Sequence, residues 1–217
     1  MTAQTPIPDY DAARLAMVDG QLRPQGVNDR VVLNAMAAVP REQFVPEDLR
    51  PLAYVDRSLP IGDGRMLAPA TVLGLLLTQM LPEKGERALV VGAGTGYSAA
   101  VLQAIGIEVI ALESSAALAA AARELGVKVV EGPLEAGHKA GAPYDLILID
   151  GAVETLPDAL VAQLGDGGRL GAALVDRGIT RLIIGRKAPG GGFGQQSIAD
   201  AAVAALPGFA RPRAFTF

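Results

Sequence analysis

The sequence predicts a single α/β domain over residues 1–217, with a doubly wound, mostly parallel sheet and a helical N-terminal cap. From Arg87 onward, short apolar runs alternate with helical segments, and such alternation is typical of βαβ units in a parallel sheet. Before Arg87, apolar residues recur at helical spacing instead. We therefore expect a helical cap, which also covers the active site, over residues 1–82. The sheet region that binds a ligand is expected over residues 83–217.

The cap is predicted as helices joined by one long connection. Residues 10–22 carry apolar side chains at helical spacing, and Asn28 is a suitable N-cap for a second helix that ends at Pro40. Residues 40–69 are rich in proline and glycine and lack periodicity, so we expect an irregular connection. Connections of that length inside a compact domain are usually functional. A third helix is expected to begin at Pro69 and to end near Met80.

The sheet region is predicted as strands that alternate with helices. Continuous apolar runs are typical of strands that are covered on both faces, and glycine or proline residues separate them from the helices. Ser114 or Ser115 can cap an alanine-rich helix that ends at Gly126. The expected strands are 88–91, 108–112, 127–130, 145–149, 169–174 and 181–185, with 214–217 as a candidate last strand. The other helices are 97–104 and one that begins at Pro157, and residues 189–194 are expected to form a turn.

The composition excludes several classes of protein. Half of the residues are hydrophobic and 19% are charged, which excludes intrinsic disorder. With no cysteine and one histidine, disulfides, thiolate nucleophiles and zinc sites are excluded, and no metal is expected. A net charge of -4 argues against a nucleic-acid partner. Neither a signal peptide nor a membrane-spanning apolar run is found, so we expect a cytoplasmic protein without a membrane partner. The oligomeric state stays open.

A glycine-rich loop follows the first expected strand and opens a helix. It reads Gly92-Ala93-Gly94-Thr95-Gly96-Tyr97-Ser98. Glycines allow the backbone to turn tightly, and ligands of parallel sheets bind at the carboxyl ends of the strands. Glu113 ends the next strand, where a carboxylate can accept both hydroxyls of a ribose. We expect the bend to leave room for a nucleoside whose sugar is held by Glu113.

Several nucleotide-binding motifs compete for this loop. A phosphate-binding loop of the Walker type needs a Gly-Lys-Ser/Thr ending, which is missing. The dinucleotide pattern can be placed on Gly94, Gly96 and Ala99, but a nicotinamide oxidoreductase would lack a Tyr-x-x-x-Lys pair. Gly92-x-Gly94-x-Gly96 better matches the loop of S-adenosylmethionine-dependent methyltransferases. A turn that binds nothing is the remaining alternative. The nucleophile elbow of a hydrolase is incomplete here.

Longer motifs resemble the protein-L-isoaspartate O-methyltransferases. They are VPREQFVP at residues 39–46 and AYVDRSLPIG at residues 53–62, followed by the glycine loop. The resemblance covers nearly the whole chain. It implies a class I methyltransferase fold and methylation of isoaspartyl carboxylates in damaged proteins or peptides, a repair reaction that uses S-adenosylmethionine. It further implies that the cofactor is bound by the following residues: Gly92, Ala93, Gly94, Thr95, Gly96, Tyr97, Ser98, Glu113, Ser114, Pro133 and Leu134.

The sequence departs from this family at three places. After the PIG element the family usually reads Gln-Thr-Ile-Ser-Gln-Pro, but residues 64–69 read GRMLAP and carry no hydroxyl. The family's Gly-Asp-Gly after the third strand is replaced by Gly-Pro-Leu at residues 132–134. At the end of the fourth strand the family usually has an uncharged residue, whereas this sequence has Asp150. An S-adenosylmethionine-binding relative without repair activity, or with another methyl acceptor, is therefore the alternative.

Arg65 and Asp150 are the candidate catalytic residues. A carboxylate acceptor is ionised at neutral pH and needs no strong base, so the enzyme has mainly to position it. The guanidinium of Arg65 can bind such a carboxylate through two hydrogen bonds, unless Arg65 is simply a solvated loop residue. Asp150 either orients or deprotonates a neutral acceptor, or caps a turn at Gly151. Tyr97 is expected to pack beside the loop rather than to catalyse.

Overall fold

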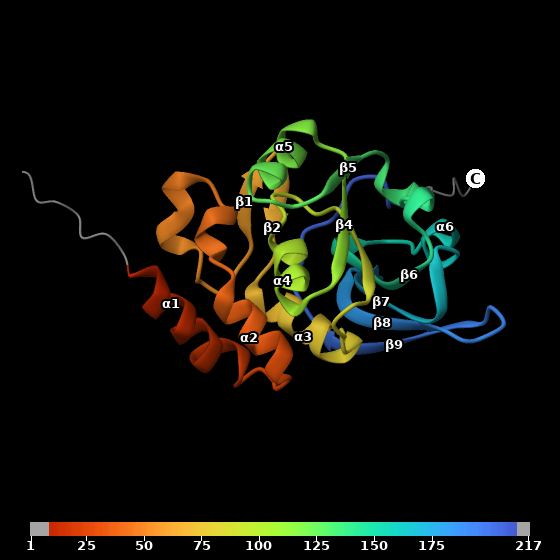
Figure 1. Ribbon diagram of the computed structural model, residues 1–217, viewed down its shortest axis with the longest axis horizontal. Coiled ribbons are helices and arrows are strands. Elements are labelled where there is room, and N and C mark those ends of the chain that lie inside the picture. Colours follow the sequence, from red (N-terminus) through yellow and green to blue (C-terminus); the bar gives the residue numbers. More distant parts are fainter. Residues whose placement is uncertain (1–8, 212–217) are drawn as a thin grey trace, which may run out of the picture.

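The computed structural model describes residues 9–211 and has a seven-stranded sheet at its centre (Figure 1). The strands are β3 (Arg87–Val91), β4 (Glu108–Glu113), β5 (Val129–Glu131), β6 (Tyr144–Val153), β7 (Leu164–Asp176), β8 (Ile179–Lys187) and β9 (Phe193–Asp200). Their order in the sheet is β5-β4-β3-β6-β7-β8-β9. The first five strands in this order pair in parallel, whereas β8 and β9 are antiparallel additions. The predicted doubly wound, mostly parallel sheet is confirmed.

The N-terminal part contains helices and one small hairpin. A π-helical turn, η1 (Val18–Leu22), continues α1 (Tyr10–Met17), and α2 (Arg30–Ala38) follows. The predicted irregular connection is more ordered than expected, because it holds two 3-10 helices, η2 (Arg41–Phe44) and η3 (Glu47–Leu52), and a hairpin of β1 (Leu59–Gly62) and β2 (Arg65–Leu67). Strands of three and four residues are too short to show an alternating pattern. α3 (Ala70–Met80) then leads to the sheet, with Pro69 as its N-cap rather than its first residue.

The cap of α2 is one residue further along the chain than predicted. The Asp29 carboxylate, not the Asn28 side chain, accepts hydrogen bonds from the backbone N–H groups of Val31 (2.8 Å) and Val32 (3.0 Å). In the sheet region the helices are α4 (Tyr97–Ile105), α5 (Ala116–Glu124) and the short α6 (Asp158–Val161). Of the two serines considered as caps for α5, it is Ser115 whose hydroxyl oxygen accepts the N–H of Leu118.

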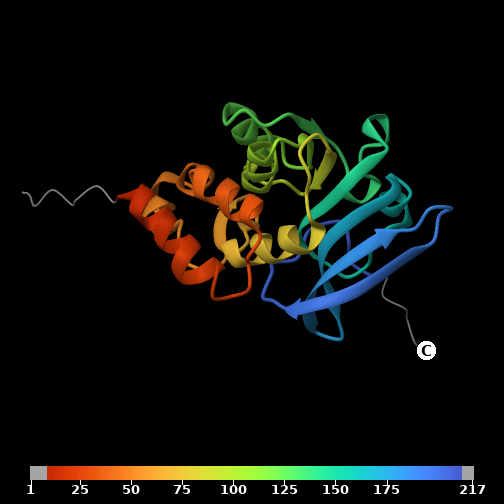
Figure 2. The same ribbon diagram turned by 60° about the horizontal axis from the view of Figure 1, so that its bottom comes forward.

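The edge strand β9 was missed by the sequence prediction. Its residues, FGQQSIAD, are half polar and mostly exposed, because β9 lies at the rim of the sheet and pairs only with β8 (Figure 2). Such a strand lacks the apolar pattern of its buried neighbours. The predicted turn at 189–194 therefore gives way to β9 at Phe193. The candidate strand at 214–217 lies outside the described residues.

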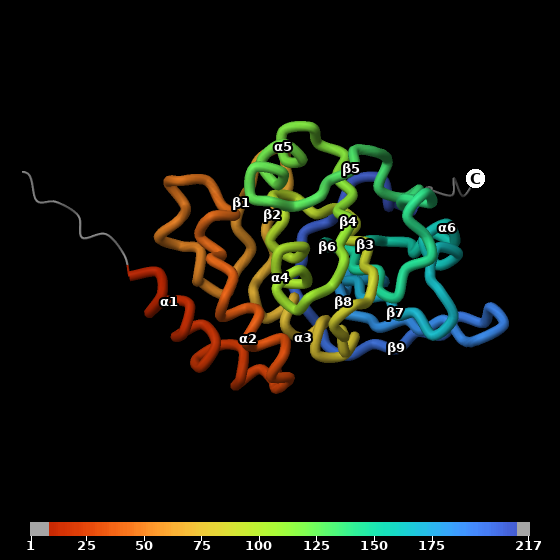
Figure 3. The backbone as a smooth tube through the Cα atoms, in the orientation of Figure 1, coloured from red at the N-terminus to blue at the C-terminus, as the bar shows by residue number. Residues whose placement is uncertain are grey.

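Two apolar layers cover the two faces of the sheet. Because side chains alternate along a strand, Ala88 and Val90 of β3 point to one layer and Leu89 and Val91 to the other. The first layer includes buried residues of α1 to α5, so the N-terminal helices share a core with the sheet. Figure 3 shows these helices and the hairpin, in red to orange, on one side of the sheet. The second layer contains residues of α6 and of the C-terminal segment.

The C-terminal segment, residues 201–211, returns to the carboxyl end of β6. The N–H of Ala152 donates to the carbonyl of Ala204, and the N–H of Leu206 donates to the carbonyl of Ala152, both at 2.8 Å. This pairing brings Leu206 to the edge of the sheet where the glycine loop lies. Across residues 9–211, no helix has the length and the apolar character that crossing a membrane requires.

Candidate functional site

The glycine loop joins β3 to α4 at the carboxyl edge of the sheet. Gly92, Gly94 and Gly96 have positive φ angles of 75°, 56° and 97°, which side chains with a Cβ rarely adopt. The N–H groups of Gly92 and Ala93 donate to the carbonyl of Leu112 at 2.9 and 3.2 Å. Since β3 and β4 are neighbouring parallel strands, these bonds hold the loop beside the end of β4.

Glu113, the last residue of β4, is fully buried against this loop. Its Oε2 accepts the N–H of Gly94 at 2.7 Å. Its Oε1 accepts the N–H groups of Ser114 (2.8 Å) and Ser115 (3.1 Å), and the Ser114 hydroxyl lies at 3.3 Å. The structure therefore brings together the loop and the acid that the sequence singled out.

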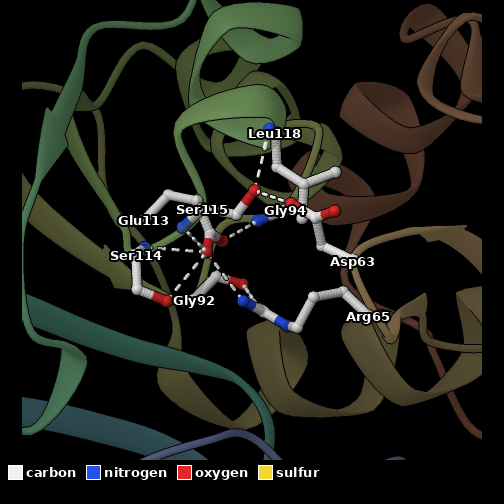
Figure 4. A network of polar contacts seen from close by, with 8 residues as sticks. All are labelled: Asp63, Arg65, Gly92, Gly94, Glu113, Ser114, Ser115 and Leu118. Atoms are coloured by element: carbon white, nitrogen blue, oxygen red, sulfur yellow. Dashed lines mark hydrogen bonds and ion pairs between the residues drawn. The ribbon is translucent and has the colours of Figure 1, made fainter.

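Arg65 also binds Glu113. Its Nη1 donates to Glu113 Oε1 at 2.7 Å, and its Nη2 donates to the carbonyl of Gly92 at 2.7 Å (Figure 4). Only 6% of the side chain is exposed, so the alternative of a solvated loop residue is wrong. The β1–β2 hairpin places Arg65 there, and the Asp63 carboxylate at the hairpin's turn accepts a hydrogen bond from the Ser115 hydroxyl.

Side chains fill the space beside the glycine loop. A Cβ on Gly94 would lie 2.6 Å from Ile61 Cδ1, and a Cβ on Gly92 would lie 2.9 Å from Leu206 Cδ2 and 3.0 Å from Arg65 Nη2. The expected open space beside Glu113 is not found, because Glu113 is fully buried against Arg65, although a cleft of about 340 Å³ borders the loop at Thr95. Neither the hairpin nor the returning C-terminal segment could be placed from the sequence. The buried acid and the glycine bend suit the sugar of a nucleoside, but the space suits it only after these side chains move.

A family model described as protein-L-isoaspartate(D-aspartate) O-methyltransferase matches residues 14–189 of the chain. The chain belongs to this family. It is 45% identical over 175 residues to the protein-L-isoaspartate O-methyltransferase of Methylorubrum extorquens (strain PA1). The aligned region covers 78% of this chain and 77% of the relative. The enzyme of that name from Koribacter versatilis (strain Ellin345) is 37% identical over 197 residues, covering 88% and 89%. The resemblance seen in the motifs is confirmed.

Solved structures support the same fold for this methyltransferase. A protein-L-isoaspartate O-methyltransferase superposes with a TM-score of 0.78 at 24% identity, over 90% of this chain and 66% of the other. A structure titled as a β-aspartate methyltransferase from Plasmodium falciparum in complex with S-adenosyl-L-homocysteine gives a TM-score of 0.77 at 19% identity, over 92% and 99%. At these identities the likeness concerns the fold, and the predicted class I fold is confirmed.

Asp150 lies on β6 beside the loop of the methyltransferase. Its Oδ2 accepts the Ser98 hydroxyl at 2.6 Å. Withdrawal of the carboxyl from water raises the pKa of Asp150, and this outweighs the Ser98 hydrogen bond and the positive charges of Arg65 and Arg41, which lower it. The strand continues through Gly151 to Val153, so the alternative of a cap for a turn at Gly151 is wrong.

Two further loop residues connect the methyltransferase site to the VPREQFVP segment. The Thr95 hydroxyl donates to the carbonyl of Phe44 at 2.6 Å. Tyr97 packs as expected: its ring meets that of Phe44 edge-on at 5.5 Å, and the Arg41 guanidinium lies 4.7 Å from its centre. These contacts anchor the loop to the N-terminal helices.

The remaining residues of the expected cofactor site follow β5. Pro133 is exposed, whereas Leu134 is buried in the second apolar layer with Leu89. The sequence prediction missed Ile61 and Leu206, which pack on the glycine loop. Ile61 belongs to the AYVDRSLPIG motif, which could have drawn attention to it. For Leu206 no local signal exists, because its place depends on the return of the C-terminal segment.

Proposed function

We propose that the chain is an S-adenosylmethionine-dependent methyltransferase that methylates the carboxylate of isoaspartyl residues in damaged proteins or peptides. The family match over residues 14–189 is the observation that carries this proposal. Its support in the site is the fully buried Glu113, hydrogen-bonded to the loop that opens α4. Cytoplasmic location and the absence of a nucleic-acid partner stay predictions.

The proposed cofactor residues surround the carboxyl ends of β3, β4 and β5. Glu113 would accept the ribose hydroxyls, the loop from Gly92 to Ser98 would bind the methionine part, and Ser114, Pro133 and Leu134 would border the rest. When bound, the cofactor supplies a methyl group on a sulfonium. The chain's own task is to exclude water and to align the acceptor, since a carboxylate is ionised at neutral pH without a base.

The proposed acceptor residues are Arg65 and Asp150. A guanidinium suits a carboxylate acceptor, and Arg65 occupies the segment that replaces the family's hydroxyl-bearing turn. Asp150 lies close enough to Arg65 for their charges to interact. We infer that Asp150 would orient or deprotonate a neutral acceptor. Its carboxylate repels an anionic acceptor unless Arg65 offsets that charge, which makes a neutral acceptor the second candidate.

The test is methyl transfer from labelled S-adenosylmethionine to an isoaspartyl peptide. The matched control is the same peptide with ordinary aspartate, which should accept no label. Arg65→Ala should raise KM for the peptide by about tenfold or more, since a charged hydrogen bond contributes about 1.5–3 kcal/mol.

Calorimetric titration with S-adenosylhomocysteine and with NAD checks the cofactor. Binding of S-adenosylhomocysteine without turnover of the peptide would contradict the repair reaction and leave another acceptor. Tight binding of NAD would contradict the cofactor assignment.

A further inference from the structure

The β1–β2 hairpin closes the site in which the nucleoside is proposed to bind. We propose that Arg65 acts as a latch: its guanidinium competes with a nucleoside for Glu113, and the nucleoside binds only when Arg65 leaves that carboxylate and the hairpin moves. This inference rests on the proposed function, because it concerns the same site. It adds a competition between a side chain of the protein and the cofactor.

The hydrogen bonds of Glu113 support the competition. A carboxylate offers about four lone-pair sites, two on each oxygen. Oε1 accepts two backbone N–H groups and the Arg65 guanidinium, while Oε2 accepts the N–H of Gly94. Two ribose hydroxyls would need acceptor sites on the same group. The backbone donors are fixed by the chain, and the Ser114 hydroxyl is a longer contact at 3.3 Å, so Arg65 is the close, charged side-chain partner that a ligand would have to displace.

Space and charge support it as well. Arg65 Nη2 also binds the carbonyl of Gly92, so the guanidinium bridges the two strand ends between which a nucleoside would lie. Because both groups are buried, the ion pair is little screened by salt. A ligand therefore has to replace a strong contact rather than to fill an open pocket.

The hairpin shares no strand pairing with the central sheet, so its movement leaves the backbone hydrogen bonds of that sheet intact. Its two strands pair only with each other. Named contacts with the sheet region include Arg65 with Glu113, Asp63 with Ser115, and Ile61 against the loop. Ile61 also borders a cleft of about 340 Å³. Opening the hairpin breaks no strand of the main sheet, but it withdraws Leu59, Ile61 and Leu67 from the first apolar layer, so the open state is a minor population.

The experiment compares the affinity for S-adenosylhomocysteine of the full chain and its variants by calorimetry. Arg65→Met should tighten binding by roughly 10- to 1000-fold, the range expected when the competent state is a minor population of about 0.1–10%. Arg30→Met, at an exposed position on α2, is the matched control and should bind S-adenosylhomocysteine as the parent does.

Asp63→Gly removes the hydrogen bond between the hairpin and Ser115, and glycine suits the positive φ of 48° at that position. It should also tighten binding, and it leaves the Glu113 ion pair in place should Arg65→Met fail to fold.

Hydrogen exchange of the parent chain provides a readout without substitution. Adding S-adenosylhomocysteine should speed the exchange of backbone amides in residues 59–67 as the hairpin leaves the loop. Unchanged or weaker binding in both Arg65→Met and Asp63→Gly, or slower exchange in the hairpin, would overturn the latch while the proposed function stands. If none of the chains binds S-adenosylhomocysteine, the proposed function and the latch fail together.

Discussion

Asp150 is a residue of the proposed site whose ionised side chain lowers the stability of the fold. Its carboxyl is partly withdrawn from water, and the Ser98 hydroxyl is its hydrogen-bond donor. The pKa of Asp150 is raised by this withdrawal, so the folded chain binds its proton more tightly than the unfolded chain does. Ionisation of this carboxyl is therefore less favourable in the folded chain than in the unfolded chain. Residues kept in such a state are frequent at functional sites.

We expect Asp150→Asn to increase the free energy of unfolding at pH 7. Asparagine removes the charge, and its side-chain oxygen can still accept the Ser98 hydroxyl. The gain should shrink as the pH falls and vanish below about pH 3, where aspartate is protonated in both states. Urea denaturation at the two pH values measures this. Asp166→Asn, at an exposed position, is the control and should show no such pH dependence. A variant less stable than the parent at pH 7 would contradict the expectation.

At the scale of elements, helix α2 shows how closely a start can be located from sequence. Asn28 and Asp29 are both good capping residues, and the pattern favoured the first. In the structure the helix begins at Arg30, and the Asp29 carboxylate accepts two backbone N–H groups of its first turn. The difference of one residue lies within the usual uncertainty of helix ends.

Asp29→Ala should lower the free energy of unfolding by about 1 kcal/mol, within a range of about 0.5–2 kcal/mol, because a cap and its two hydrogen bonds are lost. Asn28→Ala is the neighbouring control and should change it by less than about 0.5 kcal/mol, since Asn28 is exposed. The midpoint of chemical denaturation, at constant slope, measures both changes. A larger loss for Asn28→Ala than for Asp29→Ala would show that the sequence prediction had located the cap correctly.

Some strands could be predicted from the sequence and others could not, and the difference follows from how far each strand is buried. Val90 and Ile147 lie in strands covered on both faces, and such strands can be recognised in the sequence as continuous apolar runs. The edge strand β9 and the hairpin carry no such run, because one is exposed and the other is very short. The contact of Glu113 with the glycine loop followed from the order of strands. The contact of Arg65 with Glu113 did not, because it depends on how the hairpin folds back.

At the scale of the whole molecule, one apolar layer joins the N-terminal helices to the sheet. Met17 and Leu22 belong to the same cluster as Leu77 and Val90. Arg169 of β7 adds a polar connection: it binds both carboxylate oxygens of Glu86, at 2.8 and 2.9 Å, and the carbonyl of Met80 at the end of α3. We propose on this ground that residues 1–217 unfold as one domain.

Leu22→Ala tests this proposal, because Leu22 is completely buried in the cap. The free energy of unfolding should fall by about 2–5 kcal/mol, as for other large core truncations, and the whole chain should melt earlier in a single step. Calorimetry should give equal calorimetric and van't Hoff enthalpies for parent and variant. A cap that melts separately, with the transition of the sheet unchanged, would refute the single domain.

Leu206 packs against two glycines that are distant from it in sequence. A Cβ on Gly151 would lie 2.4 Å from Leu206, as one on Gly92 would lie 2.9 Å from it, and both glycines have positive φ angles, of 157° and 75°. Neither glycine can be enlarged without backbone strain, even if Leu206 were trimmed. Position 206 is therefore the one of the three that does not require glycine, although truncation of the buried Leu206 would lower the stability of the second apolar layer. A smaller residue there would open space beside the glycine loop without rebuilding any strand.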